Sequence, residues 1–124
     1  MGDPVILVVE DNERSLKLAC DVLRLGGFTT LEARSGAEAL EQAIAHQPAL
    51  VLMDVQLPDM DGVTALARLR DHERTQVIPV VAVTAFAMKG DRERLLEQGF
   101  DGYVAKPIDV RTFAGDVQAL LGRG

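Results

Sequence analysis

The hydrophobic and polar positions of the chain follow two alternating patterns. Short runs rich in apolar and β-branched residues predict strands, and apolar residues spaced three and four apart predict helices. The expected strands are residues 5–9, 28–32, 50–53, 80–83 and 102–105. The expected helices are residues 12–25, 36–46, a segment that follows Asp61-Gly62, 89–98 and 109–121. Strands and helices that alternate in this way indicate an α/β fold with a parallel sheet.

Residues at the expected helix ends support two of these boundaries. Asn12 is a favourable N-cap, and Gly26 and Gly27 supply a stop for the helix that follows it. Ser35, with Glu38 three residues later, has the pattern of a capping box. The second helix is therefore expected to begin directly after Ser35.

The expected strands differ in how apolar they are, and this difference predicts their order in the sheet. Residues 5–9, 50–53 and 80–83 are apolar throughout, as parallel strands covered on both faces are, and should be central. Residues 28–32 and 102–105 are mixed and should be edges. With right-handed crossovers, we expect a flavodoxin-like, doubly wound five-stranded parallel sheet of order 2-1-3-4-5 with five helices. Such sheets bind ligands at the carboxyl ends of the strands, beside the switch point between strands one and three.

Composition and charge narrow the functional classes. The 124 residues are enough for an independent core, and we expect one domain over residues 1–124. Thirteen Lys and Arg against 19 Asp and Glu give a net charge of −6, which disfavours direct binding to nucleic acid. The apolar runs are shorter than the roughly 18 residues of a membrane span, so no membrane association is expected. The lone Cys20 cannot form an internal disulfide and the N-terminus lacks a secretory signal, so the cytoplasm is the expected compartment.

Polar residues lie at the ends of four expected strands. Glu10 and Asp11 follow the first strand, and Asp54 follows the third. Thr84 follows the fourth and Lys106 the fifth. Clustered carboxylates repel one another unless a cation joins them, and their hard oxygen atoms suit Mg²⁺. Mg²⁺ with a lysine suggests phosphoryl transfer, in which Asp54 is the nucleophile, Thr84 donates to a phosphoryl oxygen and Lys106 balances charge.

Each of these residues also has a purely structural interpretation. Glu10 and Asp11 can favour the start of the following helix through its dipole. Thr84 can be an ordinary strand-end hydroxyl, and Lys106 can be a solvated lysine whose stem packs on the sheet edge. An acid at a strand end, such as Asp54, is often only a loop or helix cap. The five residues together favour the functional interpretation more than any one of them does.

Five short motifs show a resemblance to the response-regulator receiver family. They are Val-Val-Glu-Asp-Asn at 8–12, Leu-Met-Asp-Val-Gln-Leu-Pro at 52–58, Met-Asp-Gly at 60–62, Val-Thr-Ala at 83–85 and Ala-Lys-Pro at 105–107. All of them fall in the family's order and together span the chain. The segment 79–91 is similar to DivK-type single-domain receivers and to receivers attached to hybrid histidine kinases.

This resemblance implies a phosphorylation site at Asp54. The donor would be a phosphohistidine on a histidine kinase or a histidine phosphotransfer protein, and the output would be a downstream protein target. The resemblance further implies that Mg²⁺ is bound by Asp11, Asp54 and the backbone carbonyl of Gln56, with Glu10 acting through a water. The chain would catalyse its own phosphorylation and dephosphorylation as a signalling switch, and not act as an enzyme on other substrates.

The resemblance also implies how the switch works. Thr84 would move toward the phosphoryl group and Tyr103 would turn inward, which alters the surface formed by strand five and helices four and five. The Lys106-Pro107 bond is expected to be cis. An aromatic residue on an edge strand is, however, often only half-buried packing, and this alternative stays open for Tyr103.

Two other functions are weighed against this one. A haloacid-dehalogenase-type phosphatase also forms an aspartyl phosphate, but its nucleophile follows the first strand and has a second Asp two residues later, where this chain has Gln56 after Asp54. A degenerate receiver would lack a site residue, and all are present. The donor is expected to dock on the helix-one residues Glu13, Arg14, Lys17 and Leu18 and on the loop 107–109. The residues Phe86, Met88 and Lys89 either tune the acyl phosphate or cover the core.

Overall fold

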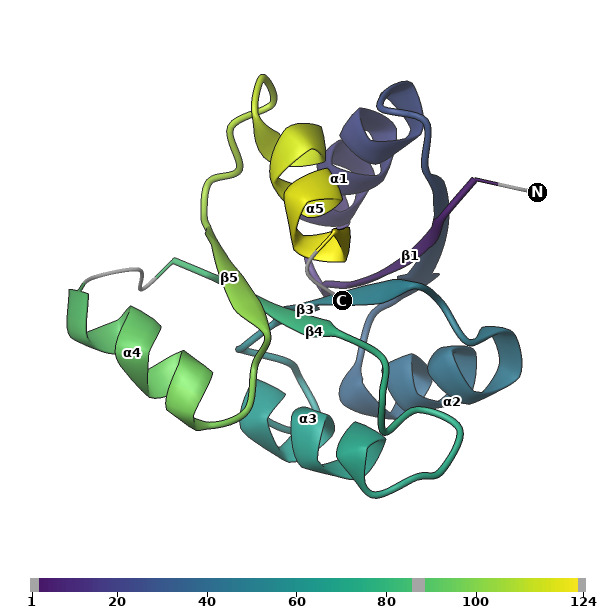
Figure 1. The fold of residues 1–124 in the computed structure, drawn as a ribbon, viewed down its shortest axis with the longest axis vertical. Coiled ribbons are helices and arrows are strands. Elements are labelled where there is room, and N and C mark those ends of the chain that lie inside the picture. The colour runs from purple at the N-terminus through teal and green to yellow at the C-terminus, as the bar shows by residue number, and fades with distance from the viewer. Residues whose placement is uncertain (1–2, 86–88, 123–124) are drawn as a thin grey trace.

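A computed structural model describes residues 3–85 and 89–122 of the chain. Within these residues, five strands alternate with five helices (Figure 1). The strands are β1 (Val5–Val9), β2 (Thr29–Ala33), β3 (Leu50–Asp54), β4 (Val80–Thr84) and β5 (Gly102–Ala105). The helices are α1 (Glu13–Leu25), α2 (Gly36–His46), α3 (Gly62–Arg70), α4 (Lys89–Glu97) and α5 (Phe113–Leu121). Phe86, Met88 and the side chain of Lys89 lie outside the described part, so their expected role stays a prediction.

All five strands are parallel, and their order in the sheet is β2-β1-β3-β4-β5. This order confirms the predicted flavodoxin-like topology, with β1, β3 and β4 in the centre and β2 and β5 at the edges. Central strands were expected to be covered on both faces and edge strands to be covered less. Accordingly, every residue of β3 is buried, whereas only Ala33 of β2 is fully buried. The switch point lies where β1 pairs with both β2 and β3.

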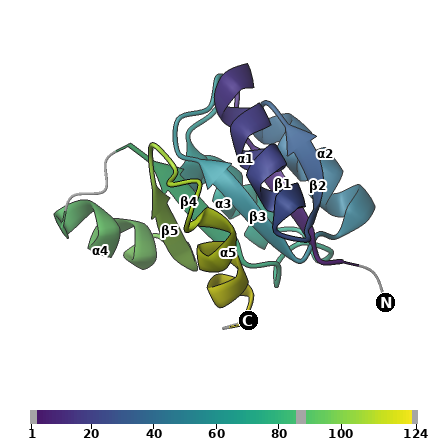
Figure 2. The same cartoon turned by 90° about the horizontal axis from the view of Figure 1, so that it is seen from above.

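The helices cover both faces of the sheet. Helices α1 and α5 lie on one face, and α2, α3 and α4 lie on the other (Figure 1, Figure 2). Alternate residues of β1 point to opposite faces, so Ile6 and Val8 pack in the cluster under α1 and α5, whereas Leu7 and Val9 pack in the other cluster. Cys20 is fully buried in the α1–α5 cluster, as expected for a small core residue.

Side-chain caps start the first three helices. The Asn12 side chain accepts a hydrogen bond from the backbone N–H of Ser15 at 3.0 Å, and the Ser35 hydroxyl oxygen accepts one from the backbone N–H of Glu38 at 3.1 Å. Both caps confirm the predicted helix starts. Asp61 caps α3 in the same way, through the backbone N–H of Thr64 at 2.7 Å.

The predicted start of the last helix is wrong by four residues. The sequence pattern suggested residue 109, but α5 begins at Phe113. The side chain of Asp109 accepts a hydrogen bond from the backbone N–H of Arg111 at 2.9 Å, and residues 110–112 form a turn. This local bond competes with a helical conformation of the segment. The second strand also begins one residue later than predicted, at Thr29, because the backbone N–H of Phe28 donates to the carbonyl of Leu23 in α1 at 3.0 Å.

Candidate functional site at the carboxyl ends of the strands

The predicted site residues lie at one edge of the sheet. Glu10 follows β1 directly, Asp54 is the last residue of β3, Thr84 is the last residue of β4, and Lys106 follows β5. Parallel pairing aligns these ends, since Asp54 pairs with Val83 and Thr84 pairs with Ala105. The β1–β3 neighbourhood therefore brings the carboxylates together at the switch point, where ligands bind in doubly wound sheets.

Lys106 connects two carboxylates in this cluster. Its Nζ donates hydrogen bonds to Oε2 of Glu10 and to Oδ2 of Asp54, both at 2.7 Å. The side chains of Glu10 and Asp54 are buried, whereas that of Lys106 is one-quarter exposed. These two charge-assisted hydrogen bonds fix the ammonium group, so the alternative of a solvated lysine is wrong.

Backbone groups orient the same two carboxylates. The backbone N–H of Gln56 donates to Oδ1 of Asp54 at 2.9 Å, and the backbone N–H of Asn12 donates to Oε1 of Glu10 at 3.2 Å. Each carboxylate thus has one oxygen toward Lys106 and the other toward a backbone N–H.

The two buried carboxyl groups differ in protonation. Burial, followed by the hydrogen bond with Asp54, raises the pKa of Glu10 from 4.5 to about 7, against the opposing effect of Lys106. Burial also acts to raise the pKa of Asp54, but its hydrogen bonds with Glu10, Lys106 and the backbone of Gln56 outweigh this effect and hold the pKa below its usual value. At neutral pH, Asp54 is therefore ionised, which is the form that a nucleophile requires, whereas Glu10 lies near the midpoint of its titration.

Asp11 completes a group of three carboxylates. One oxygen each from Glu10, Asp11 and Asp54 lies within 4.8 Å of the others, and Asp11 is exposed to solvent. Hard oxygen ligands with one open side match the preference of Mg²⁺, which keeps several waters and takes one or two carboxylates. The single ammonium of Lys106 leaves negative charge for a divalent cation to neutralise. The donor set therefore fits Mg²⁺.

Gln56 is placed in the loop directly after β3. It is exposed, and it forms an isolated antiparallel bridge with Asp61 across this loop. The bridge and the Gln56 N–H bond to Asp54 hold its backbone beside the carboxylate cluster.

Thr84 and Tyr103 lie in different environments. Thr84 is 2% exposed and lines a cavity of about 340 Å³ together with Val55 and Leu95. Tyr103 is partly buried on β5 and packs against the hydrophobic cluster on the α2–α3–α4 face. The guanidinium carbon of Arg92 in α4 lies 5.3 Å from the centroid of its ring. The half-buried packing considered for Tyr103 is therefore present in this state. The Lys106-Pro107 bond is cis, as expected.

Comparison with known proteins identifies the family. The model of the response regulator receiver domain matches residues 6–118. This chain belongs to the response regulator receiver family. It is 46% identical over 117 residues to the polar-differentiation response regulator DivK of Brucella ovis, an alignment that covers 94% of this chain and 95% of the relative.

Solved receiver structures share the fold. A putative response regulator from Chloroflexus aurantiacus is similar with a TM-score of 0.89 and 31% identity, over 98% of this chain and 99% of that one. The receiver domain of a sensor histidine kinase from Pseudomonas aeruginosa is similar with a TM-score of 0.87 and 32% identity, over 98% and 99% of the two chains. That structure has a magnesium ion coordinated in its active-site cleft. Receiver domains are signalling switches that interact with kinases or phosphotransfer proteins and with downstream targets.

Asp59 has a structural role that the sequence pattern did not predict. Its carboxylate accepts hydrogen bonds from the backbone N–H groups of Gly36 at 2.8 Å and Ala37 at 3.0 Å. In the sequence, Asp59 lies between Pro58 and Met60 and looks like an ordinary loop residue. Its partners lie more than twenty positions earlier, so no local signal could reveal the contact.

The structure also reports on membrane spans. Among the helices of the described residues, none is both long enough and apolar enough to cross a bilayer.

Proposed function

We propose that residues 1–124 form one receiver domain that accepts a phosphoryl group on Asp54 and thereby switches a protein-binding surface. The observation that carries the proposal is the anionic Asp54, buried at the end of β3, with the Lys106 ammonium 2.7 Å away and two further carboxylates within 4.8 Å. This arrangement pairs a nucleophile with the cationic charge that phosphoryl transfer requires.

The proposed reaction forms an acyl phosphate on Asp54. A carboxylate oxygen of Asp54 attacks the phosphorus of a phosphohistidine, the P–O bond forms, the P–N bond breaks and the donor imidazole takes up a proton. The backbone N–H of Gln56 holds the carboxylate in place, and Lys106 offsets the negative charge that gathers on the phosphoryl oxygens. Hydrolysis of the acyl phosphate returns Asp54 to its starting form.

Four residues would hold Mg²⁺ in this proposal. Asp11 and Asp54 would bind it through their carboxylates, Gln56 through its backbone carbonyl, and Glu10 through a water. When bound, Mg²⁺ supplies positive charge to the oxygens of the transferred group. The raised pKa of Glu10 in the metal-free protein makes this residue the point at which protons compete with the cation.

The proposed switch begins with Thr84. Its hydroxyl donates to the new phosphoryl oxygens, and Tyr103 turns from its position beside Arg92 toward the interior. The surface that changes is formed by α4, β5 and α5, where a cavity of about 510 Å³ is lined by Arg92, Tyr103 and Leu120 among others. A downstream protein binds this surface in one state of Asp54.

The phosphodonor is proposed to dock beside α1. An apolar cavity of about 280 Å³ reaches from Leu18 of α1 to Pro107 and Ile108, and its lining includes Glu10 and Lys106. Leu18 is 42% exposed at the rim of this cavity. A histidine-bearing helix that covers Leu18 and Ile108 therefore approaches the carboxylate cluster directly.

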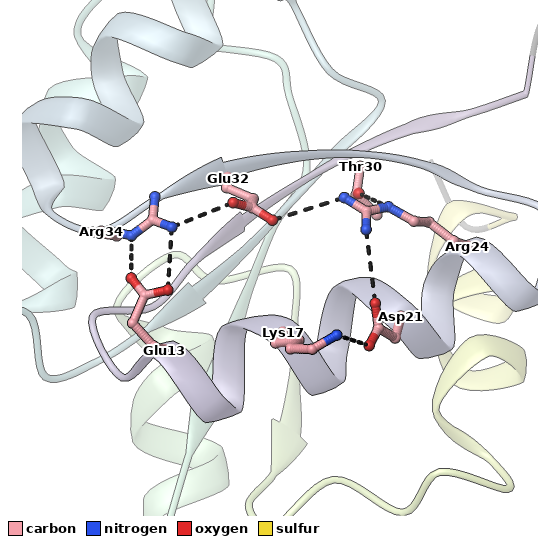
Figure 3. Close-up of polar contacts among 7 residues, drawn as sticks. All are labelled: Glu13, Lys17, Asp21, Arg24, Thr30, Glu32 and Arg34. Atoms are coloured by element: carbon pink, nitrogen blue, oxygen red, sulfur yellow. Dashed lines mark hydrogen bonds and ion pairs between the residues drawn. The ribbon is translucent and has the colours of Figure 1, made fainter.

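Charged residues on α1 contribute less to this docking surface. Glu13 pairs with Arg34 and Lys17 pairs with Asp21, in an ion-pair network that continues through Arg24 to Glu32 and ties α1 to β2 (Figure 3). Exposed ion pairs contribute little net free energy, so exchanging them for ion pairs with a donor should add little to binding. We therefore place more of the donor's binding energy on Leu18 and Ile108 than on Glu13 and Lys17.

The central claim is tested by chemical phosphorylation. Incubation with acetyl phosphate and Mg²⁺ should add the mass of one phosphoryl group to the intact chain, and hydroxylamine should remove it. Asp54→Asn should prevent the addition, whereas Glu41→Gln, at an exposed position of α2, should leave it unchanged. An unmodified wild-type mass under these conditions would contradict the proposal.

A further inference from the structure

The loop of residues 55–61, between β3 and α3, is attached to the start of α2 by Asp59. Both carboxylate oxygens of Asp59 are used, one by the N–H of Gly36 at 2.8 Å and the other by the N–H of Ala37 at 3.0 Å. These N–H groups belong to the first turn of α2, where they have no partner within the helix and where the helix dipole favours an anion. The same two N–H groups lower the pKa of Asp59, that of Gly36 most.

The neighbouring residue of the loop packs against the same helix start. A Cβ atom on Gly36 would lie only 2.5 Å from Sδ of Met60. The absence of a side chain at Gly36 therefore allows the loop to approach α2 closely. Asp59 and Met60 together define where the middle of the loop lies.

The two ends of the loop are fixed by other contacts. At its start, the backbone N–H of Gln56 is bonded to Asp54, and at its end the backbone N–H of Gly62 donates to the carbonyl of Val55 at 2.9 Å. Asp61 forms both the bridge with Gln56 and the cap of α3. The backbone of Gln56 is thus held between Asp54 on one side and the segment that Asp59 anchors on the other.

We propose that Asp59 is a positioning residue for the cation site, because its attachment to α2 sets the place of the Gln56 backbone carbonyl. The inference rests on the proposed function, in which this carbonyl is a ligand of Mg²⁺. Mg²⁺ demands nearly ideal octahedral geometry, so a small displacement of one protein ligand lowers affinity. Partners that orient ligands without touching the metal commonly change metal affinity by about 10- to 100-fold when they are removed.

A simple helix cap is the rival explanation for Asp59, and Ser35 separates the two. Ser35 caps the same helix through the N–H of Glu38 at 3.1 Å, but it belongs to the segment before α2 and not to the loop. Removing the Ser35 hydroxyl weakens the start of α2 without releasing residues 55–61. Ser35→Ala is therefore a matched control for Asp59→Ala.

The test measures Mg²⁺ binding to the whole chain by isothermal titration calorimetry, with circular dichroism as a check of folding. Asp59→Ala should raise the dissociation constant for Mg²⁺ by about tenfold, and Asp59→Asn, which keeps its acceptor oxygen but loses its charge, should fall between it and the wild type. Ser35→Ala should keep the wild-type constant. With acetyl phosphate, Asp59→Ala should need more Mg²⁺ for half-maximal labelling but reach the wild-type rate at saturation.

The outcomes separate this inference from the proposed function. Wild-type protein that does not bind Mg²⁺ would overturn both. If the wild type binds Mg²⁺ and both Asp59 variants bind it with the same affinity, only the role of Asp59 would be overturned. Equal weakening by Ser35→Ala and Asp59→Ala would show that Asp59 is only a helix cap. If Asp59→Ala does not fold, Asp59→Asn decides by the same comparison.

Discussion

Lys106 and Asp54 form an ion pair of 2.7 Å although their strands, β5 and β3, are separated by β4. The lysine follows β5 directly, and its side chain reaches past the end of β4 to the carboxylate at the end of β3. The same ammonium also contacts Glu10 beyond β1, so one cation connects three strand ends. Its position makes Lys106 both a stabilising charge of the metal-free protein and a competitor of any cation that binds there.

Replacing Lys106 by Met should therefore have opposite effects on folding and on Mg²⁺ binding. Without the ammonium, two buried carboxylates lose their cationic partner, so the free energy of unfolding in EDTA should fall by about 1–3 kcal/mol. This is less than the roughly 3–5 kcal/mol lost when a fully buried ion pair is broken, because Lys106 is partly exposed. Mg²⁺ should bind more tightly because a repelling charge is gone. Labelling by acetyl phosphate should nevertheless slow. Urea unfolding and titration calorimetry measure the first two effects, and weaker Mg²⁺ binding would contradict this account.

The raised pKa of Glu10 predicts how stability depends on pH in metal-free protein. Between pH 4.5 and about 7 the folded state holds a proton on Glu10 that the unfolded state has released, so the free energy of unfolding should fall as pH rises through this window. The full shift corresponds to roughly 3 kcal/mol, and solvent near the open side of the site should reduce it to about 2. The lowered pKa of Asp54 changes the free energy of unfolding only below about pH 3.8, which is outside this window.

Glu10→Gln should flatten this dependence, because the variant has no group that titrates at this position. Glu41→Gln, at an exposed position of α2, should keep the wild-type slope. Urea unfolding in EDTA from pH 4.5 to 8 measures both. A wild-type stability that rises through the same window would show that Glu10 is not the protonated member of the pair.

The sequence was sufficient to predict the sheet because the relevant signals are local. Continuous apolar runs marked β1, β3 and β4 as central, and parallel strands necessarily place their carboxyl ends at one edge. Glu10 and Asp54 therefore had to lie side by side once the strand order was known, and Lys106 had to lie at the same edge of the sheet. Composition and periodicity could not show which carboxyl keeps a proton, because that depends on burial and on the hydrogen bonds between Glu10, Asp54 and Lys106.

Contacts between segments far apart in the chain were the part that the sequence could not predict. Asp59 bonds to Gly36, and Glu13 bonds to Arg34, across separations of more than twenty residues. The start of α5 was misplaced for a local reason, because an apolar helical period does not reveal that Asp109 closes a turn first. The expected docking surface on α1 stays a prediction, although Glu13 in this surface pairs with Arg34 from outside the helix.

Tyr103 offers an optical signal for the proposed switch. It is the only tyrosine, and the chain has no tryptophan, so fluorescence excited near 280 nm reports on this ring alone. Phosphorylation with acetyl phosphate and Mg²⁺ should change the signal of the wild type but not of Asp54→Asn. A constant signal in fully phosphorylated protein would contradict the movement of Tyr103.

Arg92 should stabilise the present position of Tyr103. A cation over an aromatic ring contributes about 0.5–1 kcal/mol at exposed sites, so Arg92→Ala should raise the population of the inward ring by roughly two- to fivefold before phosphorylation. The fluorescence of the unphosphorylated variant should then move toward the phosphorylated value. Glu93→Gln, an exposed neighbour on α4, should leave the signal unchanged.

Two glycines should respond to alanine in opposite ways. A Cβ on Gly62 would lie 2.8 Å from the backbone Cα of Val55 and 3.3 Å from the carbonyl oxygen of Asp54, so α3 and the loop after β3 would have to separate. Gly62→Ala should lower the free energy of unfolding by about 1–3 kcal/mol. It should also weaken Mg²⁺ binding, because the displaced backbone includes the neighbour of Gln56. Gly115→Ala, in α5, meets no atom within 4 Å and should stabilise the protein by about 0.5–1 kcal/mol with unchanged Mg²⁺ affinity. Urea unfolding and titration calorimetry on both variants test this, and a Gly62→Ala protein with wild-type stability would show that the loop tolerates displacement from α3.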